Sequence, residues 1–196
     1  MIEVKIETDE EELLYQFPEN WDEVTVKQFC DVFRNNYDNH NNFYASVLLM
    51  SALTGVDKEI IEMMDVDDFK MLLEKLKFMQ EDVVRSEDES IIINDEEYFL
   101  HTDFSKYTTG EIITIEVLLE QAQNNVITIM TDLLCVFLRK KNSKGNIEKF
   151  KTSFMARKEE FEKLPISKIY HIFGFFLDIK NISINNTKDF MPNQEK

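Results

Sequence analysis

The chain has 196 residues, a length that suits one ordinary domain or two small ones. Its formal net charge of −16, from 38 acidic and 22 basic residues, repels a nucleic acid backbone, so no nucleic acid partner is expected. Hydrophobic residues make up 43% of the chain, enough for a packed core, while four glycines and three prolines are too few for a barrel of many short strands. We therefore expect a mainly α-helical protein with small β-hairpins, of the α+β class.

The composition also bears on the compartment. The longest apolar stretches, residues 126–138 and 169–177, are too short and too interrupted to span a bilayer, and residues 1–12 are unlike a secretory signal. Cys30 and Cys135 lie far apart in apolar helical patterns and are too few for a disulfide framework. We expect a soluble intracellular protein with two buried thiols and no membrane partner.

The N-terminal residues predict a β-hairpin. Ile2, Val4 and Ile6 alternate with charged residues, which is the period of a strand with one covered face. Residues 13–17 can pair back onto this strand, and Pro18 ends them.

A helix start follows the hairpin. Thr25 is the expected N-cap, Gln28 completes a capping box, and Val24 can pack against Phe29 as a hydrophobic staple. Trp21, just upstream, is the strongest single core candidate of this half because of its large apolar area. The helix should bury one face made of Val26, Phe29, Cys30 and Phe33.

Further helices are expected over residues 43–53 and 57–64, and another begins after Asp65. The last of these should bury a stripe made of Phe69, Leu72, Leu73, Leu76 and Met79. Methionines could instead line an adaptable groove for a partner helix, although packing in the core is the favoured interpretation: Met50, Met63, Met64, Met71 and Met79.

The second half predicts the same order of elements. Residues 91–100 form a hairpin with its turn near Asn94 and Asp95, and a helix runs from Thr108 to about residue 121. Three helices are expected beyond it, over residues 125–138, 147–162 and 167–179, the first closed by the cations of residues 139–141 and followed by a turn at 142–145.

Residues 15–32 align with residues 98–115 at an offset of 83 residues without a gap, while the last helices align at an offset of 100 because the second half has gained 17 residues. Trp21 then corresponds to Phe104, Thr25 to Thr108, and Gln28 to Glu111. We interpret this as an internal repeat of two similar hairpin-plus-helices modules. The expected domains are a first module over residues 1–80, an acidic linker over 81–90, a second module over 91–184 and a flexible tail over 185–196.

Residues that could support catalysis do not form a recognisable set. His40, His101 and His171 are isolated, and no metal-ligand spacing or glycine-rich phosphate loop occurs. The sequences Thr108-Thr-Gly-Glu111 and Asp65-Val-Asp67-Asp68 are better explained as helix caps than as phosphate or calcium loops. We assign no catalytic, cofactor-binding or metal-binding residue, expect no enzyme activity and no cofactor, and leave the partner-binding surface unassigned.

One motif carries a resemblance. The pattern P-x-x-W-x-x-V-T-x-x-Q-F spans Pro18 to Phe29, and Phe161 to Ile166 leads into an aromatic-rich helix. With the N-terminal strand and helical body, these segments resemble tail assembly chaperones and related small assembly or virion accessory proteins of tailed bacteriophages. The resemblance implies a non-enzymatic protein that binds another phage structural protein, namely a tail, tape-measure or neck/head component. It would act in the host cytoplasm during assembly or within the virion, with a homo-oligomer compatible with that role.

Two other classes of function stay open. The charge of −16 is compatible with an acidic inhibitor that mimics DNA and blocks a host nuclease or restriction system. An enzyme that the motifs do not reveal would require a deep pocket with convergent polar groups.

Overall fold

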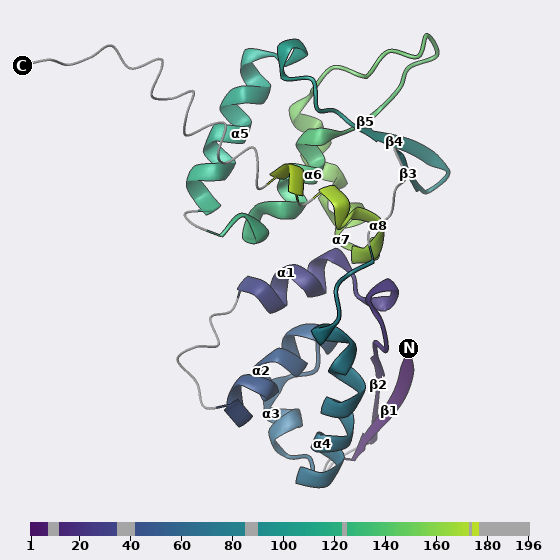
Figure 1. Ribbon diagram of the computed structural model, residues 1–196, viewed down its shortest axis with the longest axis vertical. Helices are drawn as coiled ribbons and strands as arrows, with labels where there is room; N and C mark the ends of the chain where they lie inside the picture. The colour runs from purple at the N-terminus through teal and green to yellow at the C-terminus, as the bar shows by residue number, and fades with distance from the viewer. Residues whose placement is uncertain (8–11, 35–41, 85–89, 123–124, 173, 177–196) are drawn as a thin grey trace, which may run out of the picture. The chain divides into compact units, whose positions relative to one another are not determined.

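The computed structural model describes residues 1–7, 12–34, 42–84, 90–122, 125–172 and 174–176 (Figure 1). The chain is mainly helical with two small antiparallel sheets, which confirms the expected α+β class. Contacts divide it into a first unit, Met1–Arg85 with Glu162–Lys168, and a second unit, Ser86–Phe161 with Ile169–Lys196. Residues 162–168, expected in the second module, thus group with the first unit; the expected tail at 185–196 lies outside the described residues.

The first unit opens with the predicted hairpin. Strand β1 (Ile2–Glu7) pairs antiparallel with β2 (Glu12–Phe17), and the register sets Val4 opposite Tyr15 and Ile6 opposite Leu13. These four side chains share one face of the sheet, because directly opposed residues of an antiparallel pair point the same way. Ile6 is buried, so this is the covered face that the alternation predicts.

The first capping box is confirmed. After the 3-10 helix η1 (Trp21–Glu23), the Thr25 amide donates to Gln28 Oε1 at 2.8 Å and the Gln28 amide donates to Thr25 Oγ1 at 3.2 Å, and α1 (Val26–Arg34) begins. The prediction was wrong for Phe33, which is 43% exposed, because Val32 takes the inward position one helical turn after Phe29.

Four helical segments complete the first unit: α2 (Asn42–Thr54), α3 (Lys58–Glu62), α4 (Val66–Lys75) and η2 (Leu76–Gln80). The predicted stripe is buried at Phe69, Leu72 and Leu76 but only partly at Leu73 and Met79, since α4 ends at Lys75 and the chain tightens into a 3-10 helix.

Trp21 is only partly buried, contrary to the expectation that it is the main core residue. Its ring packs edge-on against Phe29 and Phe78, with centroids 5.9 and 5.3 Å away. Its indole Nε1 donates to the Glu81 carbonyl at 3.0 Å, so the polar edge of the ring is held near the surface.

A segment from late in the chain completes the first unit. We call residues 162–168 the strap. The Val26 amide donates to the Leu164 carbonyl and the Ile166 amide donates to the Val24 carbonyl, both at 2.8 Å, and Thr25 faces Pro165 in an antiparallel bridge. Ile166 is fully buried, so the strap contributes to the core as well as to the backbone hydrogen bonds.

The second unit contains a three-stranded sheet. The predicted hairpin is confirmed as β3 (Ser90–Ile93) and β4 (Glu96–Leu100), joined by Asn94 and Asp95 with φ of 51° and 63°. Positive φ at both positions is the signature of a type I′ turn. A third strand, β5 (Leu138–Lys140), pairs with β4 and was not predicted.

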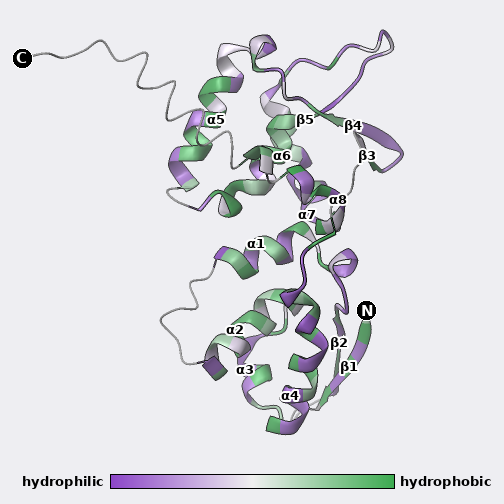
Figure 2. Ribbon diagram, viewed as in Figure 1, coloured by the Kyte–Doolittle hydropathy of each residue, from purple (hydrophilic) through white to green (hydrophobic). Residues whose placement is uncertain are grey.

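The helix expected from Thr108 to about residue 121 is confirmed as α5 (Thr109–Ala122), whereas the helices expected over 125–138 and 147–162 are broken into shorter segments. The other helical segments after β4 are η3 (Phe104–Lys106), η4 (Val126–Ile129), α6 (Met130–Phe137), η5 (Thr152–Arg157) and α7 (Lys158–Glu162). The last one, α8 (Ile166–Ile169), begins within the strap and so lies mostly in the first unit. Figure 2 shows α6 as a largely hydrophobic helix, as befits its burial. The predicted helix over 147–162 was wrong at its start, because Ile147 bridges to Lys141 and holds the chain extended.

The alignment at 83 residues is matched by local geometry. Asn20 and Asp103 accept hydrogen bonds from Asp22 and Ser105 and open η1 and η3. In the second box, the Thr108 amide donates to Glu111 Oε2 at 2.7 Å and the Glu111 amide donates to Thr108 Oγ1 at 3.3 Å, the arrangement seen at Thr25 and Gln28. Beyond these helix starts the two units differ in their strands and helices, and common descent from a repeat stays a prediction.

Candidate docking groove

The first unit is hollowed along β1. An open groove of about 640 Å³ is lined on one side by five consecutive residues, Ile2 to Ile6. Because successive side chains of a strand point to opposite faces, a hollow that touches five in a row must run along the edge of the strand. No β2 residue lines it, and among the described residues β1 pairs with β2 alone. The groove therefore follows the open edge of β1.

The opposite wall is one face of α4, made by residues at the helical spacing i, i+3, i+4 and i+7: Asp68, Met71, Leu72 and Lys75. Leu72 is buried beneath this wall, whereas Met71 is 57% exposed. Met63 and Met64, from the turn between α3 and α4, extend the wall, and Met63 is 62% exposed. The groove thus has a backbone edge on one side and flexible thioethers on the other.

A second, smaller hollow adjoins the first. It measures about 310 Å³ and is lined by residues of α2, α3 and α4, among them Phe43, Val66 and Phe69. Met64 lines both hollows. Phe43 is 51% exposed and Val66 is 53% exposed, and the ring of Phe43 lies 4.9 Å from that of Phe69. Apolar surface therefore continues from the groove to this second hollow.

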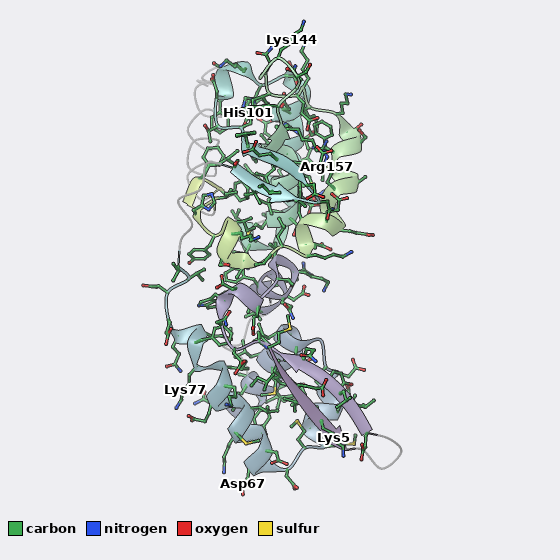
Figure 3. All side chains as sticks on the ribbon, turned by 90° about the vertical axis from the view of Figure 1, so that its right-hand side faces the viewer. Lys5, Asp67, Lys77, His101, Lys144 and Arg157 are labelled. Carbon is green, nitrogen blue, oxygen red and sulfur yellow. The ribbon has the colours of Figure 1, made fainter. Side chains whose placement is uncertain are left out.

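Carboxylates border both hollows. We call this group the acidic ridge, and it consists of Glu59, Glu62, Asp65, Asp67 and Asp68, all of which are exposed. Asp65 and Asp68 line the groove, and Glu62 lines the second hollow. None of these three carboxylates forms an ion pair within the described part of the chain, whereas Glu59 and Asp67 have lysine neighbours at 3.7 and 3.3 Å. Figure 3 shows Asp67 on this ridge and Lys5 on β1.

The ridge belongs to the acidic part of the molecule. Twenty of the 38 acidic residues but only eight of the 22 basic ones lie within residues 1–85, a net charge of −12 for that stretch. A surface of this sign attracts cationic partners and speeds their encounter. The groove therefore combines a backbone edge, adaptable apolar contacts and negative charge in one place.

The residues considered in the sequence analysis lie in different places. Of the five methionines, Met63, Met64 and Met71 line the groove, Met50 is fully buried and Met79 is partly buried. Asp65 stands at the N-cap position of α4, although its side chain makes no capping hydrogen bond. The groove lining contains no histidine or cysteine, and the described residues hold no group of three His, Cys, Asp or Glu side chains that could bind a metal ion.

The histidines do not converge. His101 is buried in the second unit, where burial and then the nearby Arg139 lower its pKa. His171 is partly buried, and His40 lies outside the described residues. Cys30 and Cys135 are both buried, as expected.

Arg139 is the feature that sequence reasoning missed. It was expected to close the helix over residues 125–138, but it lies in β5, is fully buried, and its Nη2 donates to Glu111 Oε1 at 2.9 Å. The rings of Phe150 and Phe154 lie 4.8 and 5.1 Å from the guanidinium carbon, within cation–π range. Burial lowers the pKa of Arg139, and the Glu111 carboxylate opposes that effect. This ion pair joins α5 to β5 and is structural.

Comparisons with known proteins add no assignment: no family model matches the chain, and neither a curated protein nor a solved structure matches it. Among the described residues, none of the helices has the length and apolar character needed to cross a membrane.

Proposed function

We propose that this chain is a non-enzymatic binding protein that holds an extended segment of another protein in the groove of its first unit. The observation that carries the proposal is the open edge of β1 facing the exposed methionines Met63 and Met71 across a groove. A strand edge offers unsatisfied N–H and C=O groups, and an added strand supplies their partners along its whole length.

The chemistry of the walls defines the occupant. Apolar side chains on one face of the added strand would pack on Met63, Met64 and Met71, whose unbranched thioethers adapt to different shapes. Long, flexible lysine or arginine side chains on the other face would reach round to the exposed Asp65 and Asp68 at the border of the groove. The occupant is therefore an extended segment that alternates apolar and basic residues.

The biological setting follows from the resemblance of Pro18–Phe29 and Phe161–Ile166 to phage assembly proteins. In this proposal the partner is another phage structural protein, a tail, tape-measure or neck/head component, and binding takes place in the host cytoplasm during assembly. Holding an otherwise exposed segment until its final neighbour arrives is what an assembly chaperone must do, and the open strand edge is suited to it.

The groove is tested with a labelled ten-residue peptide that alternates lysine with valine, and with a matched peptide that carries glutamate in place of lysine. We expect the lysine peptide to bind about tenfold tighter or more. In amide hydrogen exchange its binding should protect the amides of β1. Unchanged exchange at β1, or equal affinity for the two peptides, would refute the proposed groove.

Two variants locate the binding. Met71→Arg places a cation and bulk in the groove, and Ile113→Arg makes the same change at an equally exposed residue of α5, since the two side chains are 57% and 54% exposed. Loss of peptide binding in the first variant alone supports the groove. Equal loss in both would mean that the peptide responds only to overall charge.

The assembly role needs a separate experiment. Co-expression with each tail, tape-measure and neck/head protein of the same phage should yield one complex that Met71→Arg abolishes and Ile113→Arg preserves. Mass spectrometry of purified virions then distinguishes an assembly chaperone, absent from the particle, from a virion component.

The concentration of charge in residues 1–85 also supports the second candidate, an acidic DNA mimic that inhibits a host nuclease or restriction enzyme. That function predicts nuclease inhibition that weakens as the salt concentration rises. Met71→Arg and Ile113→Arg add the same charge, so they should affect this inhibition equally. Exposed Met63 and Val66 between the carboxylates favour the first candidate, since a phosphate mimic has no use for apolar contacts.

A further inference from the structure

The second unit carries a basic surface that the proposed function does not use. We call residues 138–151 the basic hairpin. It contains five lysines, Lys140, Lys141, Lys144, Lys149 and Lys151, and one carboxylate, Glu148. Lys144, Lys149 and Lys151 are exposed and form no ion pair with any residue that the structure describes. In a chain of net charge −16, this concentration of unneutralised positive charge is exceptional.

Hydrogen bonds to backbone amides fix the conformation of the hairpin loop. The Asn142 side chain accepts hydrogen bonds from the amides of Lys144 and Asn146 at 2.9 and 3.1 Å, and Gly145 adopts a φ of +74° that closes the loop. Figure 3 shows Lys144 at the tip of this loop. The lysines are therefore presented by an ordered backbone, which lowers the entropy cost of binding.

The base of the hairpin is fixed as well. Glu148 accepts hydrogen bonds from the Lys140 amide at 3.1 Å and from Arg157 Nη1 at 2.8 Å. Arg157 in turn lies over the ring of Phe154, 3.9 Å from its centroid. The one carboxylate of the hairpin is thus already bound to groups of its own unit and leaves the outward lysines uncompensated.

We propose that the basic hairpin docks on the acidic ridge of a second copy of this chain, so that copies associate head to tail. Within the described residues, three carboxylates of the ridge form no ion pair: Glu62, Asp65 and Asp68. Three exposed lysines of the hairpin likewise form no ion pair there. The proposal rests on the site of the proposed function, because the ridge borders the groove.

Charge favours a protein partner over a polyphosphate. Residues 1–85 carry a net charge of −12, which repels a nucleic acid from the whole molecule but attracts the hairpin of another copy. At physiological salt the screening length is about 8 Å, so the net repulsion between two copies is largely screened while opposite charges in contact still attract. A head-to-tail contact is heterologous and leaves one unused surface at each end of the assembly.

Sedimentation of the full chain tests the proposal. We expect association at about 50 mM sodium chloride that weakens by roughly tenfold or more at about 500 mM, where the screening length is about one third as long. A chain that stays monomeric at millimolar protein concentration in low salt overturns the proposal. Binding of a DNA duplex through the hairpin without self-association overturns it too.

Charge reversal identifies the two surfaces. The hairpin variant Lys144→Glu, Lys149→Glu, Lys151→Glu and the ridge variant Glu62→Lys, Asp65→Lys, Asp68→Lys should each be monomeric alone. Mixed together they should associate again, because the intact hairpin of one meets the intact ridge of the other, and the reversed hairpin likewise meets the reversed ridge with opposite charge. A control that reverses Lys77, Lys106 and Lys168, exposed lysines outside the hairpin, should associate like the wild type. If the mixture stays monomeric, the proposed pairing is wrong.

The experiment separates this inference from the proposed function. The groove variant Met71→Arg should lose the lysine–valine peptide, while the hairpin variant should keep it because its groove is intact. Peptide binding without self-association would overturn the head-to-tail contact alone. Self-association without peptide binding would overturn the groove alone.

Discussion

The two capping boxes of this protein are alike in geometry and unlike in consequence. Thr25 with Gln28 and Thr108 with Glu111 make the same pair of reciprocal hydrogen bonds at the start of α1 and α5. Gln28 is neutral and partly exposed, but Glu111 is buried and uses its second oxygen to bind Arg139. A single difference, amide against carboxylate, thus turns a local cap into a link between α5 and β5.

The comparison shows that a local motif does not reveal the distant partners of its side chains. A capping box involves residues three apart, and its carboxylate version carries a charge that must be compensated if it is buried. In α5 that compensation comes from Arg139, 28 residues further along the chain. The four predictions below test the difference between the boxes, beginning with the largest effect.

The largest effect is expected for Arg139→Met. The change leaves the Glu111 carboxylate buried without its partner, which should lower the free energy of unfolding by about 3–5 kcal/mol. Urea denaturation of the full chain measures this change. In hydrogen exchange, the amides of α5 should lose more protection than those of α1. Adding Glu111→Gln, which converts the second box into a copy of the first, should recover most of the stability. No recovery would mean that the ion pair is not the source of the loss.

The reciprocal exchange of the box residues comes next. Glu111→Gln should lower the free energy of unfolding by about 2 kcal/mol, because Arg139 loses a charged acceptor. Gln28→Glu should change it by less than about 0.5 kcal/mol, since a partly exposed carboxylate at a helix N-terminus is tolerated. Equal effects at both positions would contradict the contrast drawn between the boxes.

Removal of the caps themselves should affect both units alike. Thr25→Ala and Thr108→Ala each remove a side-chain acceptor at the N-cap, at a cost of about 1 kcal/mol. Amide exchange in the first turns of α1 and α5 should rise in the matching variant and stay unchanged in the other helix. A larger loss for Thr108→Ala would show that the cap also orients Glu111 toward Arg139.

The smallest effect is expected for Glu148→Gln, and it should depend on pH. Burial, the largest influence, would raise the pKa of Glu148, but hydrogen bonds from Arg157 and the Lys140 amide outweigh it, so the pKa lies below the ordinary value of 4.5. A lowered pKa in the folded state gives stability that is present above the unfolded-state pKa and lost as the pH falls through the folded-state value. Glu148→Gln should therefore be less stable than the wild type by under about 1 kcal/mol at pH 7, because the carboxylate is a quarter exposed.

The check is the pH dependence of that difference, which should vanish in acid as the wild-type carboxylate takes up its proton. A difference that persists unchanged in acid would mean that charge is not its cause.

Local chemistry was predictable from the sequence. Both boxes and the type I′ turn at Asn94 and Asp95 involve residues at most three apart, so their signals lie within one short window. Hydrophobic alternation was likewise enough to place β1 and β2.

Non-local pairing was not predictable. Strand β5 is three residues long, and its pairing of Tyr98 with Lys140 leaves no trace in the sequence around either residue. The position of the strap was not predictable either, because no residue near Leu164 indicates that its carbonyl binds the Val26 amide. Arg139 was predicted to close a helix together with Lys140 and Lys141, and only the fold reveals that it is buried against the Glu111 carboxylate.

The groove could be predicted from the sequence only in part. The methionines had been recognised as possible groove residues, although packing in the core was the favoured interpretation. Which methionines face outward depends on where β1 lies relative to α4, and that is set by packing between segments more than fifty residues apart in the chain. Exposure of Met63 and Met71, and burial of Met50, could therefore not be distinguished in advance.

The strap ties the first unit to the timing of protein synthesis. Val24 and Val26 obtain their hydrogen-bond partners only when Leu164 and Ile166 have left the ribosome. A nascent chain that ends before residue 164 would leave the Val24 carbonyl and the Val26 amide without these partners at the start of α1. The amino-terminal unit of this protein thus obtains these two hydrogen bonds only after more than 160 residues have been synthesised.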